Sequence, residues 1–317
     1  MPIEEKIEQN IALAQFTTFK IGGPAKFFVE VDNEHELIEA ISWAKSNGHK
    51  FFILGGGSNL LICDRGYEGL VIKNESKELF RDGNKIICDS GVALARLILS
   101  CTRHNLRNLE WAIGIPGTIG GAIRGNAGAN GYSTSKIIES VKVFRPDDNK
   151  IVEMSNEECG FDYRHSIFKY NNFIILGCTL KLTKGDPIAL KKEIDENLAK
   201  RIKSQPKYPN AGCIFKNISV KDFDLANDEL RELVEEAKSE GAINDDKLSA
   251  GWIISKLYLK GKWIGGARVS LDHANYIINK HLKATSDDVL MLISLIKQKV
   301  RVEYGMQLKE EIYYLDY

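Results

Sequence analysis

The chain has 317 residues, of which 44% are hydrophobic, and its 43 lysines and arginines balance its 43 aspartates and glutamates. This length allows two or three domains with a sizeable buried core, and the apolar fraction is that of a soluble globular protein. The charge balance excludes an overall basic field of the kind that attracts nucleic acid, although a local basic pocket stays possible.

The predicted elements begin with a strand over 26–31. A helix follows, with Asn33 and Glu36 as a capping box and Gly48 as its end. The apolar run 51–54 is too short for a helix and enters a glycine-rich stretch.

The middle of the chain, about 78–185, is predicted to be mostly β, with strands near 141–144 and 173–182. One helix interrupts it, with an apolar stripe formed by Leu94, Leu97, Ile98 and Cys101. Asp186 and Pro187 open a further helix with a cap and a proline at the first helical position. The apolar stripe expected for this helix consists of Ile194, Leu198 and Ile202.

Helical patterns then recur at 230–237 and 248–257, and a last helix is predicted from the cap Thr285, with Asp288 three residues on, to Gly305. The reading is an α+β protein in three parts. They are 1–77, to which the final strand 306–317 returns, then 78–203, and then 204–305.

The cysteines and the N-terminus indicate the cellular setting. The six cysteines are dispersed, which fits neither a zinc site nor a disulfide framework, so we expect reduced and mostly buried thiols. The first ten residues are charged and no apolar run reaches the length of a membrane span. We therefore expect a cytoplasmic protein with no membrane association. No histidine pair or HExxH motif points to a metal.

Two glycine-rich segments are the strongest chemical signal in the sequence. The first, Leu54-Gly55-Gly56-Gly57-Ser58-Asn59, follows a strand directly, and the second runs from Gly114 to Gly131. Adjacent glycines let backbone N–H groups turn toward an anion without interference from a Cβ. Either segment alone would suit a tight turn, but together they favour a dinucleotide pyrophosphate site. Neither is a Rossmann fingerprint or a P-loop.

A set of motifs in fixed order resembles the UDP-N-acetylenolpyruvoylglucosamine reductase family. The resemblance covers nearly the whole chain. The motifs are TFKIGGPA at 18–25, LGGGSNLL at 54–61, GIPGTIGGAIRGNAGANG at 114–131, YRHSIF at 163–168, PNAGCIFKN at 209–217, LKG at 259–261, IGGA at 264–267 and HAN at 273–275. Each motif is weakly specific, whereas their ordered set is highly specific.

The resemblance implies a vanillyl-alcohol-oxidase-type, two-part FAD-binding fold over 1–77 and 78–203, with a C-terminal α+β substrate-binding domain over 204–305. It implies non-covalent FAD, NADPH as co-substrate, and a monomer of the shorter family type. The expected reaction is reduction of a UDP-N-acetylglucosamine enolpyruvyl ether to UDP-N-acetylmuramate in peptidoglycan synthesis. A hydride would pass from NADPH through FAD to C3 of the enolpyruvyl group, and a proton would reach C2.

The family motifs imply which residues hold FAD. These are Leu54, Gly55, Gly56, Gly57, Ser58, Asn59, Gly114, Pro116, Gly117, Thr118, Gly120, Gly121, Asn126, Ala127 and Gly128.

Three residues are implied as catalytic. Arg164 lies in the arginine motif, where a planar guanidinium suits a carboxylate. Cys213 replaces the family's serine proton donor, and a thiol with a pKa of about 8.5 stays mostly protonated at neutral pH. Glu311 matches the family's C-terminal glutamate, with Glu310 as the alternative if the register shifts by one.

Four further residues are implied as substrate contacts: Asn217, Lys216, Arg201 and Tyr163. Lys216 could equally be a solvated lysine, Arg201 part of an exposed helix face, and Tyr163 half-buried packing. Two other functions stay open. One is an FAD-dependent oxidase of the same superfamily, and the other is a nucleotide-binding relative without catalysis.

Overall fold

The computed structural model describes residues 2–223 and 227–317, which form two compact units of discontinuous segments. Unit 1 comprises the chain up to Ile11, Pro24–Gly57 and Tyr67–Lys203. Unit 2 comprises Ala12–Gly23, Ser58–Gly66 and the described part of Ser204–Tyr317. The three-part division expected from the sequence stays a prediction. The units divide the chain differently, since two short segments of the predicted first part belong to unit 2.

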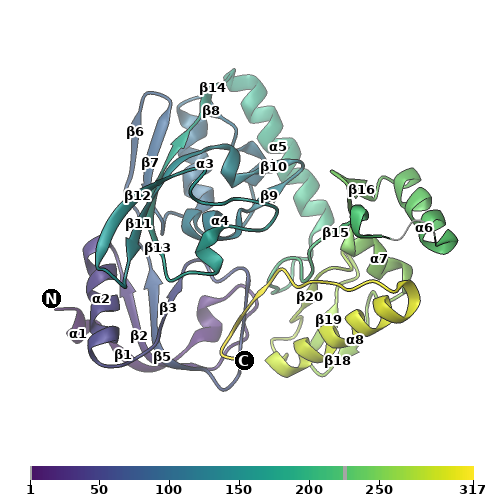
Figure 1. The fold of residues 1–317 in the computed structure, drawn as a ribbon, viewed down its shortest axis with the longest axis horizontal. Helices are drawn as coiled ribbons and strands as arrows, with labels where there is room; N and C mark the ends of the chain where they lie inside the picture. Colours follow the sequence, from purple (N-terminus) through teal and green to yellow (C-terminus); the bar gives the residue numbers. More distant parts are fainter. Residues whose placement is uncertain (1, 224–226) are drawn as a thin grey trace. The chain divides into compact units, whose positions relative to one another are not determined.

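The first sheet of unit 1 has four strands, and β2 and β3 both run parallel to β5. In order across the sheet, the strands are β1 (Glu8–Ala12), β2 (Pro24–Val31), β5 (Tyr67–Asn74) and β3 (Phe51–Leu54). Helix α2 (Glu34–Ser46) packs on this sheet through a buried stripe that includes Leu37 and Ile41, and the short helix α1 (Ile3–Lys6) lies against α2 (Figure 1). Because β3 pairs in parallel with β5 and ends at Leu54, the glycines that follow lie at the carboxyl end of this strand.

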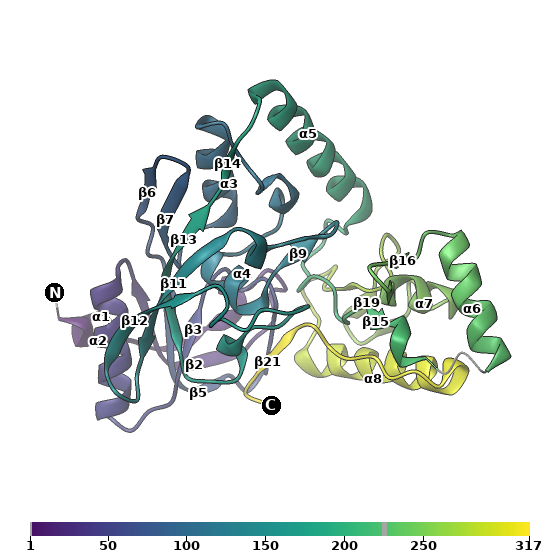
Figure 2. The same cartoon turned by 45° about the horizontal axis from the view of Figure 1, so that its top comes forward.

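The second sheet of unit 1 has five antiparallel strands. In order, they are β12 (Lys150–Ser155), β11 (Ile138–Arg145), β13 (Ile174–Lys181), β7 (Lys85–Asp89) and β6 (Leu79–Asp82). Two helices, α3 (Leu94–Arg103) and α4 (Ile119–Gly125), share its hydrophobic core. The long helix α5 (Pro187–Ser204) packs against the same core through Ile194 (Figure 2). Short pairs complete it: β8 (Leu106–Arg107) with β14 (Thr183–Lys184), and β9 (Gly128–Ala129) with β10 (Tyr132–Ser133).

The described part of unit 2 contains the helices α6 (Asp228–Ser239), α7 (Ala250–Lys256) and α8 (Ser286–Tyr304). Two small antiparallel sheets accompany them. One contains β15 (Ile218–Ser219), β17 (Lys247–Leu248) and β16 (Ile243–Asn244), and the other contains β18 (Trp263–Ile264), β19 (Ala267–Val269) and β20 (Ile277–Ile278).

The early segments of the chain take part in the core of unit 2. Phe19 and Leu61 are fully buried in the same cluster as Phe215, Ile254 and Val289. Strand β4 (Leu60–Ile62) pairs in parallel with the C-terminal strand β21 (Tyr313–Leu315). The C-terminal strand and residues 60–62 therefore lie side by side within unit 2. The expected return of the C-terminus to the active site stays a prediction.

Local capping signals account for the helix ends. The Thr285 hydroxyl accepts the Asp288 N–H while the Asp288 carboxylate accepts the Thr285 N–H, which confirms the box, and Gly305 ends α8 at φ 67°. The box predicted for α2 is wrong in one half. Asn33 accepts the Glu36 N–H, but the Glu36 carboxylate binds the Lys6 ammonium and the Asp32 N–H instead.

The stripe predicted for α5 is also wrong in part, because Ile202 is exposed and Leu190 is the buried residue of this helix.

The expectation of reduced and mostly buried thiols is confirmed. All six cysteines are free, Cys213 is half-buried and the other five are buried. Burial raises the pKa of Cys159 to about 11 and that of Cys101 to about 12, which keeps both protonated. Across 2–223 and 227–317, no helix combines the length and the apolar character needed to cross a membrane.

We predict that Thr285→Ala lowers the free energy of unfolding by about 1 kcal/mol, because the first amides of α8 lose their side-chain acceptor. Thr285→Ser keeps the hydroxyl and should stay close to the parent. Urea denaturation of both variants measures the difference. Equal stability of T285A and T285S would show that the box does not contribute.

Candidate functional site

The two glycine-rich segments meet within unit 1. A Cβ on Gly56 would lie 2.5 Å from the Gly117 Cα, and a Cβ on Gly55 would lie 2.7 Å from the Thr118 Oγ1. No real Cβ tolerates such distances, so only glycine allows the two backbones to approach this closely. The resemblance assigned both segments to FAD, and the structure places them side by side.

The backbone amides at this meeting point are available to an anion. Within the described ranges, the N–H groups of Gly56, Gly57 and Gly117 donate to no protein acceptor. Gly57 and Gly117 also have positive φ values of 60° and 116°, which a side chain would make costly. Converging amides in a glycine loop form the kind of concavity that holds a pyrophosphate.

The chain after Gly117 is held rigidly. The Thr118 side chain accepts the Gly121 N–H and starts α4, and the Gly120 N–H donates to Ser90 O at 2.8 Å. Pro116, in the same loop, is exposed, as is Gly114. These contacts fix the loop backbone whatever occupies it.

Asn126 stabilises the second half of the segment. It ends α4 in the left-handed region at φ 42°, and its buried side chain donates to Asp162 O and accepts the Ser135 N–H. Its side-chain amide is therefore engaged by the protein backbone and shapes the loop, and its expected contact with FAD stays a prediction. Ala127 O accepts both the N–H and the hydroxyl of Thr134.

Arg164 is anchored to this same loop. Its guanidinium donates to Gly128 O at 2.9 Å and lies 5.4 Å from the ring of Tyr163. Asp162 and His165 exchange backbone hydrogen bonds around it, which forms a tight turn. Arg164 occupies the left-handed region at φ 53°, which is uncommon for an arginine and is imposed by this turn.

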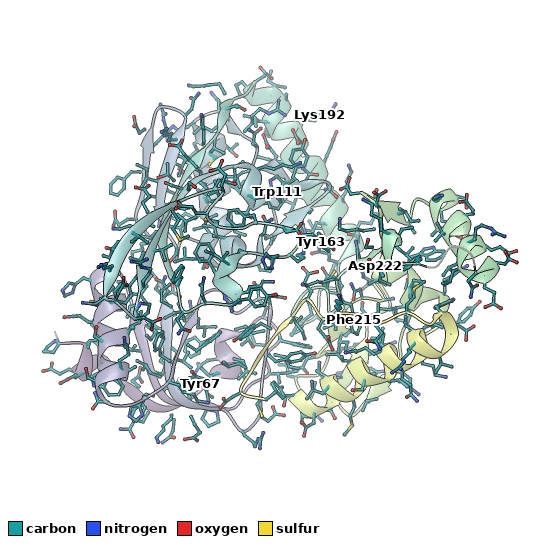
Figure 3. The ribbon with its side chains drawn as sticks, viewed as in Figure 1. Tyr67, Trp111, Tyr163, Lys192, Phe215 and Asp222 are labelled. Atoms are coloured by element: carbon teal, nitrogen blue, oxygen red, sulfur yellow. The ribbon has the colours of Figure 1, made fainter. Side chains whose placement is uncertain are left out.

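Arg201 supports the start of the segment. It lies on α5, donates to Trp111 O at 3.1 Å, and its Cδ would be 2.9 Å from a Cβ on Gly114. Asn197, one turn earlier, donates to Glu110 O. Trp111 and Tyr163, both labelled in Figure 3, thus belong to elements that frame the glycine segment in unit 1.

Cys213 lies in unit 2, in a segment that is hydrogen-bonded on both sides. Gly212 precedes it at φ 82°, and the Gly212 N–H donates to the Asn210 side chain. The buried Phe215, labelled in Figure 3, forms a bridge with Glu310 of the C-terminal segment. The Ile214 carbonyl accepts the Glu311 N–H at 2.7 Å. The structure therefore brings Cys213 and Glu311 into neighbouring, paired segments.

The two candidate glutamates differ in their surroundings. The Glu310 carboxylate forms an ion pair with Lys297 of α8 at 2.7 Å. Glu310 is thus engaged by α8, and Glu311 is the next residue along the same segment. Asn59 lies beside it, since its side chain donates to Glu311 O and its carbonyl accepts the Tyr313 N–H.

Two of the other expected substrate residues, Lys216 and Asn217, belong to the same part of unit 2 as this segment. The Lys216 N–H donates to Lys309 O, and the Asn217 side chain accepts the Ala250 N–H at the start of α7. Arg164, Tyr163 and Arg201 belong to unit 1 and Cys213, Glu311, Lys216 and Asn217 to unit 2.

Sequence reasoning missed the role of Asn275. This buried residue pairs with the backbone of Ile214 and Phe215, directly after Cys213. The only sequence signal was its membership of the HAN motif, which by itself says nothing about its partners. Among the described residues, no group of three or more His, Cys, Asp or Glu side chains could hold a metal.

Comparisons with known proteins cover almost the whole chain. A UDP-N-acetylenolpyruvoylglucosamine reductase from Clostridium novyi is 35% identical over 311 residues, which span 98% of this chain and 92% of that protein. The chain belongs to this reductase family. A relative of the same name from Caldanaerobacter subterraneus is 36% identical, over 98% of this chain and 93% of that one.

Family models and a solved structure agree. Residues 205–315 match the C-terminal domain of UDP-N-acetylenolpyruvoylglucosamine reductase, and residues 25–155 match an FAD binding domain. The crystal structure of the Thermus caldophilus reductase is 30% identical, with a TM-score of 0.76 and 98% coverage of both chains. The predicted fold class, an α+β FAD-binding fold with a C-terminal domain, is confirmed. The FAD-binding match includes both glycine-rich segments.

We predict that Gly56→Ala abolishes stoichiometric flavin binding, because its methyl group would collide with the Gly117 backbone. Gly125→Ala is the control, since a Cβ there meets no atom within 4 Å. Flavin absorbance per protein at 450 nm, a region where FAD absorbs, compares the two. A fully loaded G56A protein would contradict the proposed cradle.

Proposed function

We propose that the chain reduces a UDP-N-acetylglucosamine enolpyruvyl ether to UDP-N-acetylmuramate, with NADPH as the source of hydride and non-covalent FAD as its carrier. The observation that carries the proposal is the pairing of the Cys213 and Glu311 segments, in a chain whose relatives along its full length are named reductases of this substrate. We further propose that it acts as a cytoplasmic monomer in peptidoglycan precursor synthesis.

The residues of unit 1 suit FAD. The amides of Gly56, Gly57 and Gly117 would receive the pyrophosphate, and the close approach of the two loops fixes their positions. When bound, FAD supplies hydride chemistry, in which hydride received from NADPH is delivered to C3 of the enolpyruvyl group. Arg201, in contact with Gly114, supports the loop and is assigned to the diphosphate region.

Addition of hydride at C3 shifts electrons toward the substrate carboxylate. We assign Arg164 to this carboxylate, because a guanidinium offers two parallel donors and remains charged at any working pH. Its anchor to Gly128 O and the tight turn around it support a preorganised role. We assign Glu311 to the same substrate carboxylate, to which a protonated Glu311 would donate a hydrogen bond as the charge develops. The engagement of Glu310 with Lys297 supports the choice of Glu311.

The reaction is completed by a proton at C2. We assign this proton to the Cys213 thiol, which is half-buried and held between two hydrogen-bonded segments. A thiol is a stronger acid than the serine hydroxyl of the family motif, so the replacement keeps the chemistry possible. Lys216, Asn217 and Tyr163 are assigned to the remainder of the substrate.

We predict that Cys213→Ser stays active, whereas Cys213→Ala reduces its flavin with NADPH at the parent rate but loses turnover of the enol ether by about 100-fold or more. The two half-reactions are followed separately by stopped-flow absorbance. Parent-like turnover by C213A would remove Cys213 from the mechanism. A C213A protein whose flavin NADPH cannot reduce would show a structural effect instead.

We predict that Glu311→Gln lowers kcat by about 100-fold, whereas Glu310→Gln changes it less than about threefold. Loss of the half-exposed Glu310–Lys297 pair should cost less than about 1 kcal/mol of stability. Steady-state kinetics and thermal unfolding of the two variants provide the comparison. The reverse ranking of kcat would move the role to Glu310.

A further inference from the structure

The backbone directly after Cys213 is fully hydrogen-bonded, and the bonds come from two different sources. On one side the C-terminal segment pairs with it, since Ile214 O accepts the Glu311 N–H and the Lys216 N–H donates to Lys309 O. On the other side, the N–H groups of Ile214 and Phe215 and the carbonyl of Phe215 are all bonded to Asn275.

Asn275 supplies the hydrogen bonds that a neighbouring strand would otherwise make to Ile214 and Phe215. Its backbone carbonyl accepts the Ile214 N–H at 2.8 Å. Its side-chain Oδ1 accepts the Phe215 N–H at 2.9 Å, and its Nδ2 donates to Phe215 O at 2.8 Å. Phe215 and Asn275 are both almost completely buried. Without the amide, two buried backbone groups would lose their hydrogen-bond partners, which is unfavourable because water cannot replace them there.

Asn275 is itself fixed by its neighbours. Its N–H donates to the Nδ1 of His273 at 3.2 Å. Burial, and then the nearby Lys260, lower the pKa of His273, which keeps this ring nitrogen able to accept. The His273 carbonyl accepts the Tyr276 N–H, which closes the turn around Asn275.

We infer that Asn275 is a positioning residue for the reaction. It fixes the backbone of Ile214 and Phe215 and thereby holds the Cys213 thiol in the place from which it donates its proton. The inference rests on the proposed role of Cys213 and adds the residue that orients it. Because Asn275 acts through Phe215 and not on the substrate, its loss affects protonation and leaves flavin reduction by NADPH intact.

The chain contains a matched control for this inference. Asn279, also in unit 2 and completely buried, donates from Nδ2 to Phe19 O and Lys20 O and accepts the Ala284 N–H. Its side chain therefore makes the same kind of backbone contacts as that of Asn275, but to Phe19, Lys20 and Ala284. Only its backbone N–H, which the substitution retains, reaches the segment of Cys213, at Pro209 O. Asn275→Asp and Asn279→Asp each replace a buried donor by an acceptor at unchanged size.

The experiment compares N275D and N279D in two measurements on the full chain. The first is stopped-flow kinetics of both half-reactions. For N275D we expect oxidation of the reduced flavin by the enol ether to slow about 10- to 100-fold, with reduction by NADPH within about twofold of the parent. For N279D we expect both rates within about twofold. Asn275→Ala, which buries no charge, is the second variant if N275D does not fold, and it should give the same split.

The second measurement needs no catalysis. The alkylation rate of Cys213 by iodoacetamide, resolved by peptide mass spectrometry, should rise about tenfold in N275D and stay at the parent value in N279D. Unchanged alkylation together with unchanged half-reactions in N275D would overturn the inference, as would equal effects in N279D. If the parent's flavin is not oxidised by the enol ether but alkylation still separates the variants, then the proposed function fails and the positioning of Cys213 by Asn275 stands.

Discussion

The contact between the Gly56 and Gly117 backbones is the constraint on which the cofactor site depends. A single methyl group at Gly56 would lie 2.5 Å from the Gly117 Cα, so the two loops approach each other only because neither has a side chain at this point. The parallel strand β3 brings the first loop to the edge of its sheet, and Thr118 starts α4 immediately after the second. The glycine amides of the two loops are thus held in place by the sheet that contains β3 and by the helix cap at Thr118.

In unit 2, hydrogen bonds between backbone segments determine the surroundings of Cys213. Cys213 has no regular strand around it, yet the residues after it are bonded to the C-terminal segment on one side and to Asn275 on the other. The C-terminal segment is in turn held by Asn59 and by the pairing of β21 with β4. Segments more than two hundred residues apart in sequence therefore determine the environment of one thiol.

What the sequence predicted well has local causes. The cap at Thr285, the end of α8 at Gly305 and the strand over 51–54 depend on residues a few positions apart, and all were found. The glycine-rich segments were recognised because three consecutive glycines have a direct steric meaning. Glu36 was misassigned because Lys6, thirty residues away, competes for its carboxylate. Ile202 was wrongly predicted to be buried because it continues the helical spacing of Ile194 and Leu198 into the last turn of α5, where the side chain is exposed.

The parts that the sequence could not supply depend on distant pairing. Nothing local in 58–66 indicates that this segment belongs to unit 2 with the C-terminus, and nothing in the HAN motif indicates that Asn275 bonds to Phe215. The identity of the candidate residues came from the ordered motifs and not from periodicity. The choice between Glu310 and Glu311 gained support only from the ion pair with Lys297.

The central claim, that this chain uses FAD to pass hydride from NADPH to a UDP-linked enol ether, is tested most directly by one absorbance series under anaerobic conditions. The purified protein should show an oxidised flavin spectrum that NADPH bleaches and that the enol ether restores. A flavin that NADPH bleaches, that the enol ether leaves bleached, and that recovers only when air is then admitted would contradict the account and favour an oxidase. A flavin that NADPH does not bleach would contradict catalysis by this chain altogether.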